Sequence, residues 1–123
     1  MNSESMVKGF GAKSAGLFSS IAAVLALASA IANAAVVVST GTVSQLFTYQ
    51  DFGGGDVVFR LSTQPSGCYG FWLAPSQPGF KTTVAFIMKA QTTGESIQVG
   101  GDNAQIWNGS ASPFCKVDFV GTP

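Results

Sequence analysis

The sequence predicts a small, mainly β domain with one helix, preceded by an export signal. Three observations predict it: a charge-free apolar run near the N-terminus, several short stretches that alternate apolar and polar residues, and one stretch with helical spacing. A chain of 123 residues is long enough for one such domain.

The N-terminal third differs in composition from the rest of the chain. Two lysines precede a run without charges at residues 21–35, and the small residues at 32–34 match a cleavage site. This pattern is typical of a secretory signal peptide over residues 1–34, with translation starting at Met1 or Met6. We therefore expect an exported protein, in the periplasm or the medium.

The alternative for this run is a membrane anchor, because apolar residues continue to Val38. The run would then hold about 18 residues, which is the lower limit for spanning a bilayer. No positive cluster follows it to stop transfer. We therefore expect a cleaved leader and no membrane span in the mature protein.

Residues 35–123 carry little charge, with four basic and five acidic side chains and no histidine. This balance cannot supply the phosphate contacts on which nucleic-acid binding depends. Without histidine the chain also lacks the commonest general base and a common zinc ligand. The sequence thus predicts a non-catalytic protein that uses no metal or cofactor and binds no nucleic acid.

The two cysteines, Cys68 and Cys115, are expected to form one structural disulfide. An even count in an exported chain favours an internal bridge, and a redox role would need a CxxC pair. In the chain-entropy model, closing so long a loop stabilises the fold by roughly 4 kcal/mol.

Alternation predicts three strands in the first half of the domain, at 41–50, 56–62 and 68–73. Turns at 51–55 and 64–67 join them, because their glycines and proline suit tight connections. These segments read as a hairpin followed by a third strand.

The third predicted strand, CYGFWL, is apolar on both faces and should be covered on both. If Cys68 points into the core, Trp72 does too, whereas Tyr69 and Phe71 face outward. Trp72 is therefore predicted to be a core residue.

A helix is predicted from Phe80 to a stop at Gly94, with its apolar stripe ending on Met88. Phe86 lies off this stripe, where a monomer would favour a polar residue.

After the helix we expect a strand at 96–100, a loop at 100–103 and a short strand-like piece at 104–109. A last strand at 114–120 closes the chain with Phe114 facing outward.

The order strand, strand, strand, helix, strand, strand is the layout of the five-stranded oligonucleotide/oligosaccharide-binding (OB) barrel. In that barrel the third and last strands are neighbours, and these strands carry Cys68 and Cys115. The alternative is an open α+β sheet with the helix packed on one face.

Trp107 is the candidate for a ligand contact, because a wide, rigid ring lies here beside the polar residues Asp102, Asn103 and Gln105. The alternative role for Trp107 is a side chain that fills the barrel core. A further set of aromatic residues is predicted to form surplus outward apolar area and hence an oligomer or partner interface: Tyr69, Phe71, Phe86 and Phe114.

The segment FKTTVAFIMKAQTTGESIQVG resembles the corresponding segment of the B subunits of bacterial AB-type toxins, including subtilase-cytotoxin-like ones. The run GFWLAPSQPGFK…QVGGDNAQIWNGS…FCKV is also similar to small exported bacterial proteins of unassigned function. The toxin likeness implies an OB barrel, a ring pentamer and binding of host glycans.

Three functional hypotheses follow. The first is an exported, oligomeric binding module that recognises a glycan or a protein. The second is a structural or inhibitory partner of a cell-envelope protein. The third is a small hydrolase that uses Asp102 and a second carboxylate.

Overall fold

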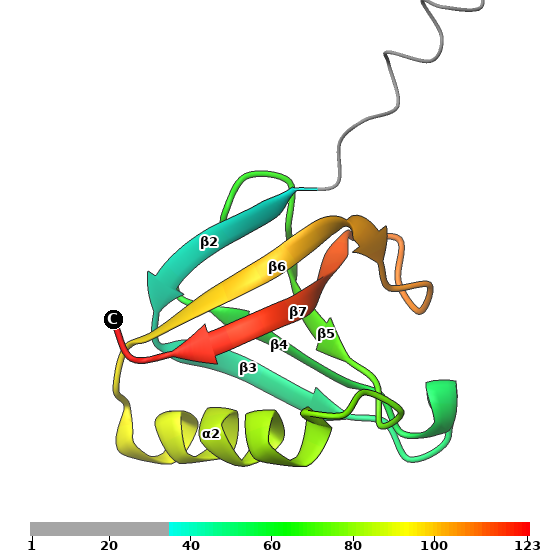
Figure 1. The fold of residues 1–123 in the computed structure, drawn as a ribbon, viewed down its shortest axis with the longest axis horizontal. Helices are drawn as coiled ribbons and strands as arrows, with labels where there is room; N and C mark the ends of the chain where they lie inside the picture. The colour runs from blue at the N-terminus through cyan, green and yellow to red at the C-terminus, as the bar shows by residue number, and fades with distance from the viewer. Residues whose placement is uncertain (1–34) are drawn as a thin grey trace, which may run out of the picture. The chain divides into compact units, whose positions relative to one another are not determined.

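A computed structural model describes residues 35–123, which form a mainly β unit with one helix (Figure 1). The predicted signal peptide, residues 1–34, lies outside the described residues. The elements are β2 (Val36–Gly41), β3 (Val43–Thr48), the 3-10 turn η1 (Phe52–Gly54), β4 (Val57–Leu61), β5 (Gly70–Leu73), α2 (Phe80–Thr93), β6 (Ile97–Ile106) and β7 (Phe114–Gly121).

The strands form one sheet in the order β2-β6-β7-β5-β4-β3. All neighbours are antiparallel except β5 and β7, which run parallel. A parallel pair needs a long crossover, and here α2 and β6 supply it. The predicted third and last strands are therefore neighbours.

The predicted closed barrel of five strands is wrong, because the sheet has six strands and is not closed. The strand expected at 41–50 is shorter, at Val43–Thr48, and a strand that was not predicted, β2, precedes it with a break at Thr42. β2 pairs with β6 and β3 pairs with β4, so these two strands form opposite edges of the sheet. The Ser39 hydroxyl of β2 donates to the Thr63 carbonyl, which links β2 to the segment that follows β4.

The loop predicted at 100–103 is wrong as well, because β6 continues through it. Gly100 and Gly101 lie in this strand because neighbouring side chains cross it closely. A Cβ atom at Gly100 would lie 2.3 Å from the Phe119 ring, and one at Gly101 would lie 2.9 Å from the Phe71 ring. These glycines therefore permit packing rather than a turn.

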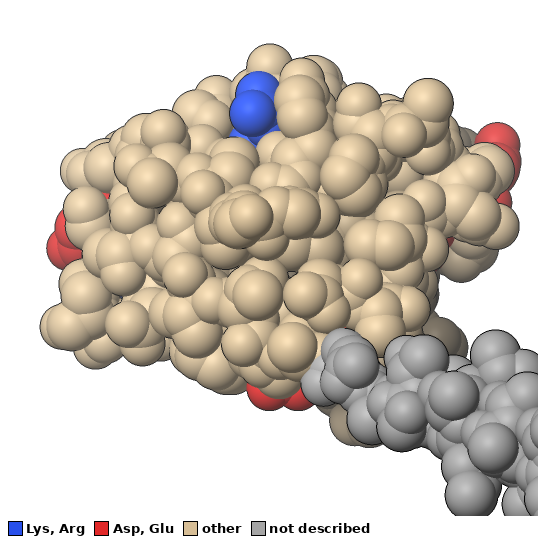
Figure 2. All heavy atoms as spheres, turned by 90° about the horizontal axis from the view of Figure 1, so that it is seen from above, with Lys and Arg blue, Asp and Glu red and all other residues tan. Residues whose placement is uncertain are grey.

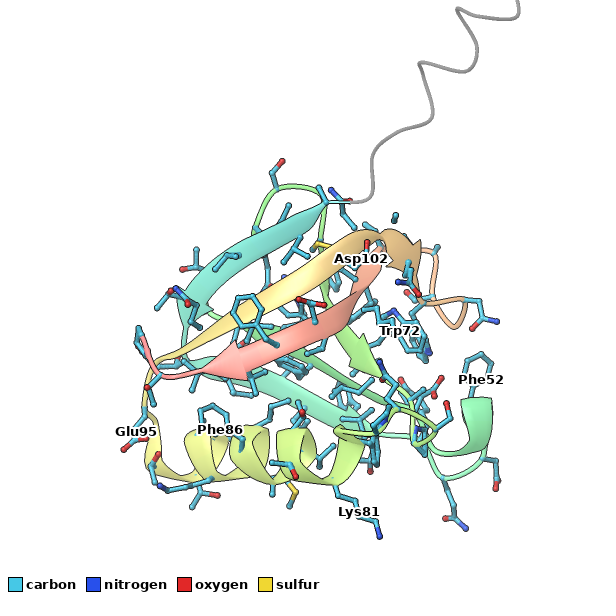
Figure 3. All side chains as sticks on the ribbon, in the orientation of Figure 1. Phe52, Trp72, Lys81, Phe86, Glu95 and Asp102 are labelled. Carbon is cyan, nitrogen blue, oxygen red and sulfur yellow. A yellow bond between two sulfur atoms is a disulfide. The ribbon has the colours of Figure 1, made fainter. Side chains whose placement is uncertain are left out.

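The main core lies between α2 and one face of the sheet (Figure 1). Its largest fully buried side chains are Phe59, Phe71, Ile87, Ile97, Val99 and Cys115. The apolar stripe of α2 is rotated from the predicted one, since Ala90 is buried and Met88 is exposed. Phe86 consequently lies between the helix and the sheet, as Figure 3 shows, and packs against the core.

Cys68 and Cys115 form the predicted disulfide, with their Cα atoms 5.6 Å apart. Cys68 lies two residues before β5, and Cys115 lies opposite Phe71 in the parallel β5–β7 pair. The bridge therefore connects the start of β5 to the strand beside it. Within residues 35–123, no helix is both long and apolar enough to cross a bilayer.

We expect that replacing both cysteines, Cys68→Ser with Cys115→Ser, lowers the free energy of unfolding by about 2–4 kcal/mol, because the bridge restricts the unfolded chain. Urea unfolding followed by circular dichroism measures the change. The unmodified protein under reducing conditions should unfold at the same urea concentration as the variant. An unchanged midpoint in both would show that the bridge adds no stability.

Candidate functional site

An aromatic cluster of five rings lies on the side of the sheet that faces away from the main core. Two of its members, Tyr49 and Phe52, come from the segment between β3 and β4, and Trp107 comes from the end of β6. Tyr69 precedes β5 and Phe114 begins β7. We call these five residues the aromatic cluster. Figure 3 shows Phe52 projecting from the η1 turn toward the β6–β7 loop, where it meets Trp107.

Trp107 lies at the centre of the cluster. Its ring centroid lies 5.4 Å from those of Tyr49 and Phe52 and 5.7 Å from that of Phe114. The contacts to Phe52 and Phe114 are edge-to-face, which aromatic quadrupoles favour. Tyr69 extends the cluster through a further edge-to-face contact with Phe114 at 5.4 Å.

A buried hydrogen bond holds Trp107 in place. Its indole N–H donates to the Asp56 carboxylate at 2.8 Å, and both residues are at least 95% buried. The loop backbone packs directly on this carboxylate, since a Cβ atom at Gly53 would lie 2.0 Å from Oδ2. The other carboxylate oxygen, Oδ1, is buried without a partner among the described residues. Among the residues that the structure describes, the Trp107 N–H is thus the one side-chain donor to this carboxylate.

The cluster combines a buried base with an exposed rim. Trp107 and Phe114 are buried, whereas Tyr49, Phe52 and Tyr69 expose 40–43% of their surface. The guanidinium of Arg60 lies 3.8 Å from the Tyr69 ring centroid, and its Nε donates to the Tyr69 carbonyl at 2.7 Å. Because their contacts already hold these rings in place, the rings lose little conformational entropy when a ligand binds.

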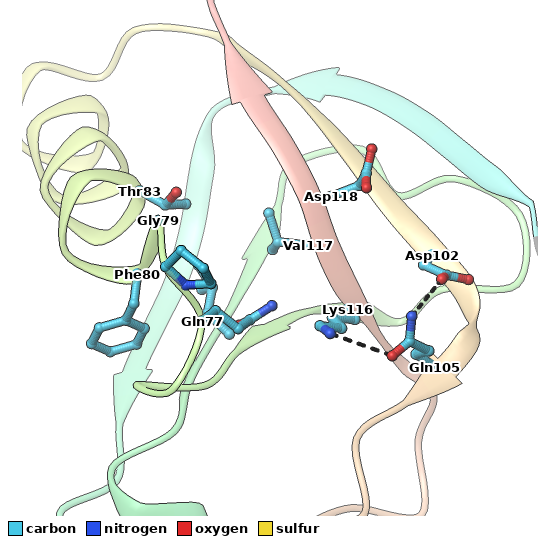
Figure 4. Close-up of a pocket in the computed structure, with 11 residues that line it drawn as sticks. Gln77, Gly79, Phe80, Thr83, Asp102, Gln105, Lys116, Val117 and Asp118 are labelled. Atoms are coloured by element: carbon cyan, nitrogen blue, oxygen red, sulfur yellow. Dashed lines mark hydrogen bonds between the residues drawn. The ribbon is translucent and has the colours of Figure 1, made fainter.

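Polar side chains extend the site along β6 and β7. Gln105 donates to the Asp102 carboxylate at 2.7 Å, and Lys116 donates to the Gln105 side-chain oxygen at 3.4 Å (Figure 4). The Trp72 indole donates to the Gln105 main-chain carbonyl at 3.0 Å. Trp72 also packs against Val58 and the buried rings of the cluster, so it joins the two parts of the site.

The hydrogen bonds of Asp102 keep it ionised. The Gln105 side chain and the Ala104 main-chain N–H both donate to it and lower its pKa, and the charge of Lys116 acts in the same direction. Desolvation raises this pKa by less than either hydrogen bond lowers it, and the charge of Lys116 has the smallest effect. Asp102 is therefore an ionised carboxylate that accepts hydrogen bonds.

The four predicted ligand-binding residues separate in the structure. Asp102 and Gln105 lie together, as predicted. Asn103 instead bonds the N-terminal end of the described chain, with its side-chain oxygen accepting from Ala35 N–H at 3.3 Å. Trp107 is buried, which agrees better with the alternative of a packing role, although it packs outside the main core.

The predicted interface residues need correction. Tyr69 is exposed as predicted, but Phe71 is fully buried in the main core and Phe114 is buried in the cluster. The error arises because Cys68 lies outside β5, so its direction does not fix which residues of that strand face inward. Trp72 is half-buried on the opposite face to the one predicted.

Five residues of the site were not predicted: Tyr49, Phe52, Asp56, Arg60 and Lys116. Tyr49 and Phe52 lie beside a glycine turn, and this sequence pattern could have indicated an exposed aromatic site. The partnership of Asp56 with Trp107 joins residues 51 positions apart, so no local pattern indicates it.

The site combines aromatic rings with hydrogen-bonding side chains and two basic residues. No group of three or more potential metal ligands occurs in residues 35–123. Figure 2 shows a face of the molecule with few charges, whose acidic side chains lie at its margins. Arg60 and Lys116 are the two basic residues of the site, too few to follow a phosphate backbone. Comparison with protein families, curated proteins and solved structures finds no match to this chain.

We expect Trp107→Phe to lower the free energy of unfolding by about 1–3 kcal/mol, because it leaves the buried Asp56 carboxylate without a donor. Trp72→Phe is the matched control, since the same change there removes a hydrogen bond that water can replace. Urea unfolding of both variants gives the comparison. Equal losses would contradict the special role of the Asp56 bond.

We expect Gln105→Ala to raise the pKa of Asp102 toward its ordinary value, because the largest cause of the lowered pKa is removed. A carboxyl-carbon NMR titration of both proteins measures the midpoints. In the unchanged protein, the hydrogen bonds to Asp102 persist as pH falls until its lowered pKa is reached. Gln98→Ala, on the same strand, should leave the midpoint unmoved. An unmoved midpoint in Gln105→Ala would contradict the assignment.

Proposed function

We propose that this protein is an exported binding module that recognises a glycan through the aromatic cluster. The observation that carries the proposal is the exposed rim of Tyr49, Phe52 and Tyr69 around the buried, hydrogen-bonded Trp107. The C–H face of a sugar ring is apolar and packs on such rings, and the sugar hydroxyls need the polar groups that lie alongside. The disulfide between Cys68 and Cys115 is compatible with export.

The strand order supports the proposal. If β2 and β3 are counted as one strand broken at Thr42, the neighbours of each strand are those of the OB fold. That fold binds oligonucleotides and oligosaccharides on its second and third strands and on the loops after the first and fourth. The corresponding parts here are β4, β5, the β3–β4 loop and the β6–β7 loop, which lie under or within the cluster. The low positive charge favours an oligosaccharide over a nucleic acid.

The resemblance to toxin B subunits adds one feature to this proposal, which is that the protein forms an oligomer. A second exposed apolar group, Val36, Val38 and Phe119, lies on the opposite part of the sheet. This group can meet a different surface of the next subunit, outside the aromatic cluster, and such head-to-tail contacts can close a ring. In this arrangement the aromatic cluster stays free for the glycan.

The test is binding of the purified protein to an array of oligosaccharides. At the glycan that binds best, we expect Tyr69→Ala and Phe52→Ala to weaken affinity at least about tenfold, which corresponds to about 1.4 kcal/mol. Met88→Ala is the control, because Met88 is an equally exposed apolar residue on α2.

Two outcomes would contradict the proposal. One is an array without binding. The other is an oligomer, measured by light scattering, that dissociates in Phe52→Ala, because the cluster would then be a contact between subunits. Capture of a cell-envelope protein that is lost in Tyr69→Ala would instead favour the second hypothesis, a structural or inhibitory partner.

A further inference from the structure

A small pocket lies between the first turn of α2 and strand β7 (Figure 4). Its volume is about 270 Å³, slightly below the range for drug-sized ligands, so it suits a single small ring. The aromatic cluster contributes no residue to its walls. Its walls include Leu73, Gln77, Asp102, Gln105, Lys116 and Val117.

The pocket has polar walls that can both donate and accept. The Gln77 side-chain oxygen accepts from the Ala74 main-chain N–H at 2.6 Å, which leaves the Gln77 amide to donate. Figure 4 shows this side chain directed toward Lys116. On the other side, Asp102 and Gln105 accept and donate within their own hydrogen bond and keep further capacity for a ligand.

The pocket also has apolar walls, to which Leu73 and Val117 of the main core contribute. A pyranose ring is amphipathic in the same manner, with C–H groups on its faces and hydroxyls around its edge. Such a ring can place its C–H face on Leu73 and Val117 while its hydroxyls meet the polar walls.

The charges of the pocket disfavour an anionic ligand. Among the described residues that line it, Lys116 is the one cation, and two carboxylates, Asp102 and Asp118, lie on the same walls. A phosphate or carboxylate ligand would meet more negative than positive charge. A neutral polyol gains the hydrogen bonds without this repulsion.

We infer that this pocket is a subsite for one neutral hexopyranose residue, held by Asp102, Gln105 and Gln77. The inference rests on the proposed function, because it assigns the pocket to one ring of the glycan whose neighbouring rings lie on the aromatic cluster. Trp72 connects the two surfaces, since it packs on the cluster and donates to Gln105.

The probes are the methyl glycosides of glucose, galactose, mannose and N-acetylglucosamine, titrated into the purified protein with saturation-transfer NMR. The variants are Asp102→Asn and Gln105→Ala in the pocket, Tyr69→Ala in the cluster, and Glu95→Gln as an exposed control beyond the far end of α2. Circular dichroism checks that each variant folds. We expect one methyl glycoside to bind, about tenfold more weakly in the pocket variants because each loses a hydrogen bond, and unchanged in Tyr69→Ala and Glu95→Gln.

Other results would overturn the inference in distinguishable ways. Binding that is lost in Tyr69→Ala but kept in both pocket variants would move the single ring to the cluster and leave the proposed function intact. Array binding without binding of any methyl glycoside, and insensitive to Asp102→Asn, would do the same. Absence of binding in both assays would overturn the inference and the proposed function together. Stronger binding of inorganic phosphate than of every methyl glycoside would overturn the inference alone.

Discussion

The hydrogen bond from the Trp107 indole to the Asp56 carboxylate is the interaction on which the candidate site depends. It is buried, and it ties the β6–β7 loop to the β3–β4 loop. Neither loop has regular structure of its own beyond the short η1 turn, so this bond and the packing of Tyr49, Phe52 and Phe114 around it fix their relative position. The Trp107 ring is held by its hydrogen bond to Asp56 and by the aromatic side chains packed around it. The exposed rings that pack on Trp107 are therefore held in place.

The architecture of the sheet places this interaction next to the pocket. The parallel pairing of β5 with β7, joined to the disulfide at its start, sets Trp72 beside Lys116. Because the chain breaks at Thr42, two consecutive strands, β2 and β3, form the two edges of the sheet. Gly100 and Gly101 have no side chains, so the rings of Phe119 and Phe71 can pack directly on β6. The main core thus packs on one face of the sheet, and the aromatic cluster packs on the other.

Much of the fold was predictable because local patterns carry it. The alternation in β4 and β7 and the helical spacing of α2 are visible in the sequence, and the disulfide follows from the count of two cysteines. β2 was missed because residues 36–38 continue the apolar run that was assigned to the predicted signal peptide. The predicted orientation of the Phe71 side chain was wrong because it was inferred from Cys68, which lies outside the strand. For the site, Asp102 and Gln105 are neighbours in sequence and were found, whereas the distant pair of Asp56 and Trp107 appears only after folding.

The central claim, that the aromatic cluster and the polar residues beside it form one glycan-binding surface, is tested most directly by mapping where a ligand lies. Cross-saturation NMR of the labelled protein with a mixture of unlabelled neutral oligosaccharides reports the amides next to bound sugar. We expect signal loss at the η1 turn, at Tyr69 and Trp72, and at the start of β7. Signal loss confined to the surface around Val38 and Phe119, or no loss at all, would contradict it.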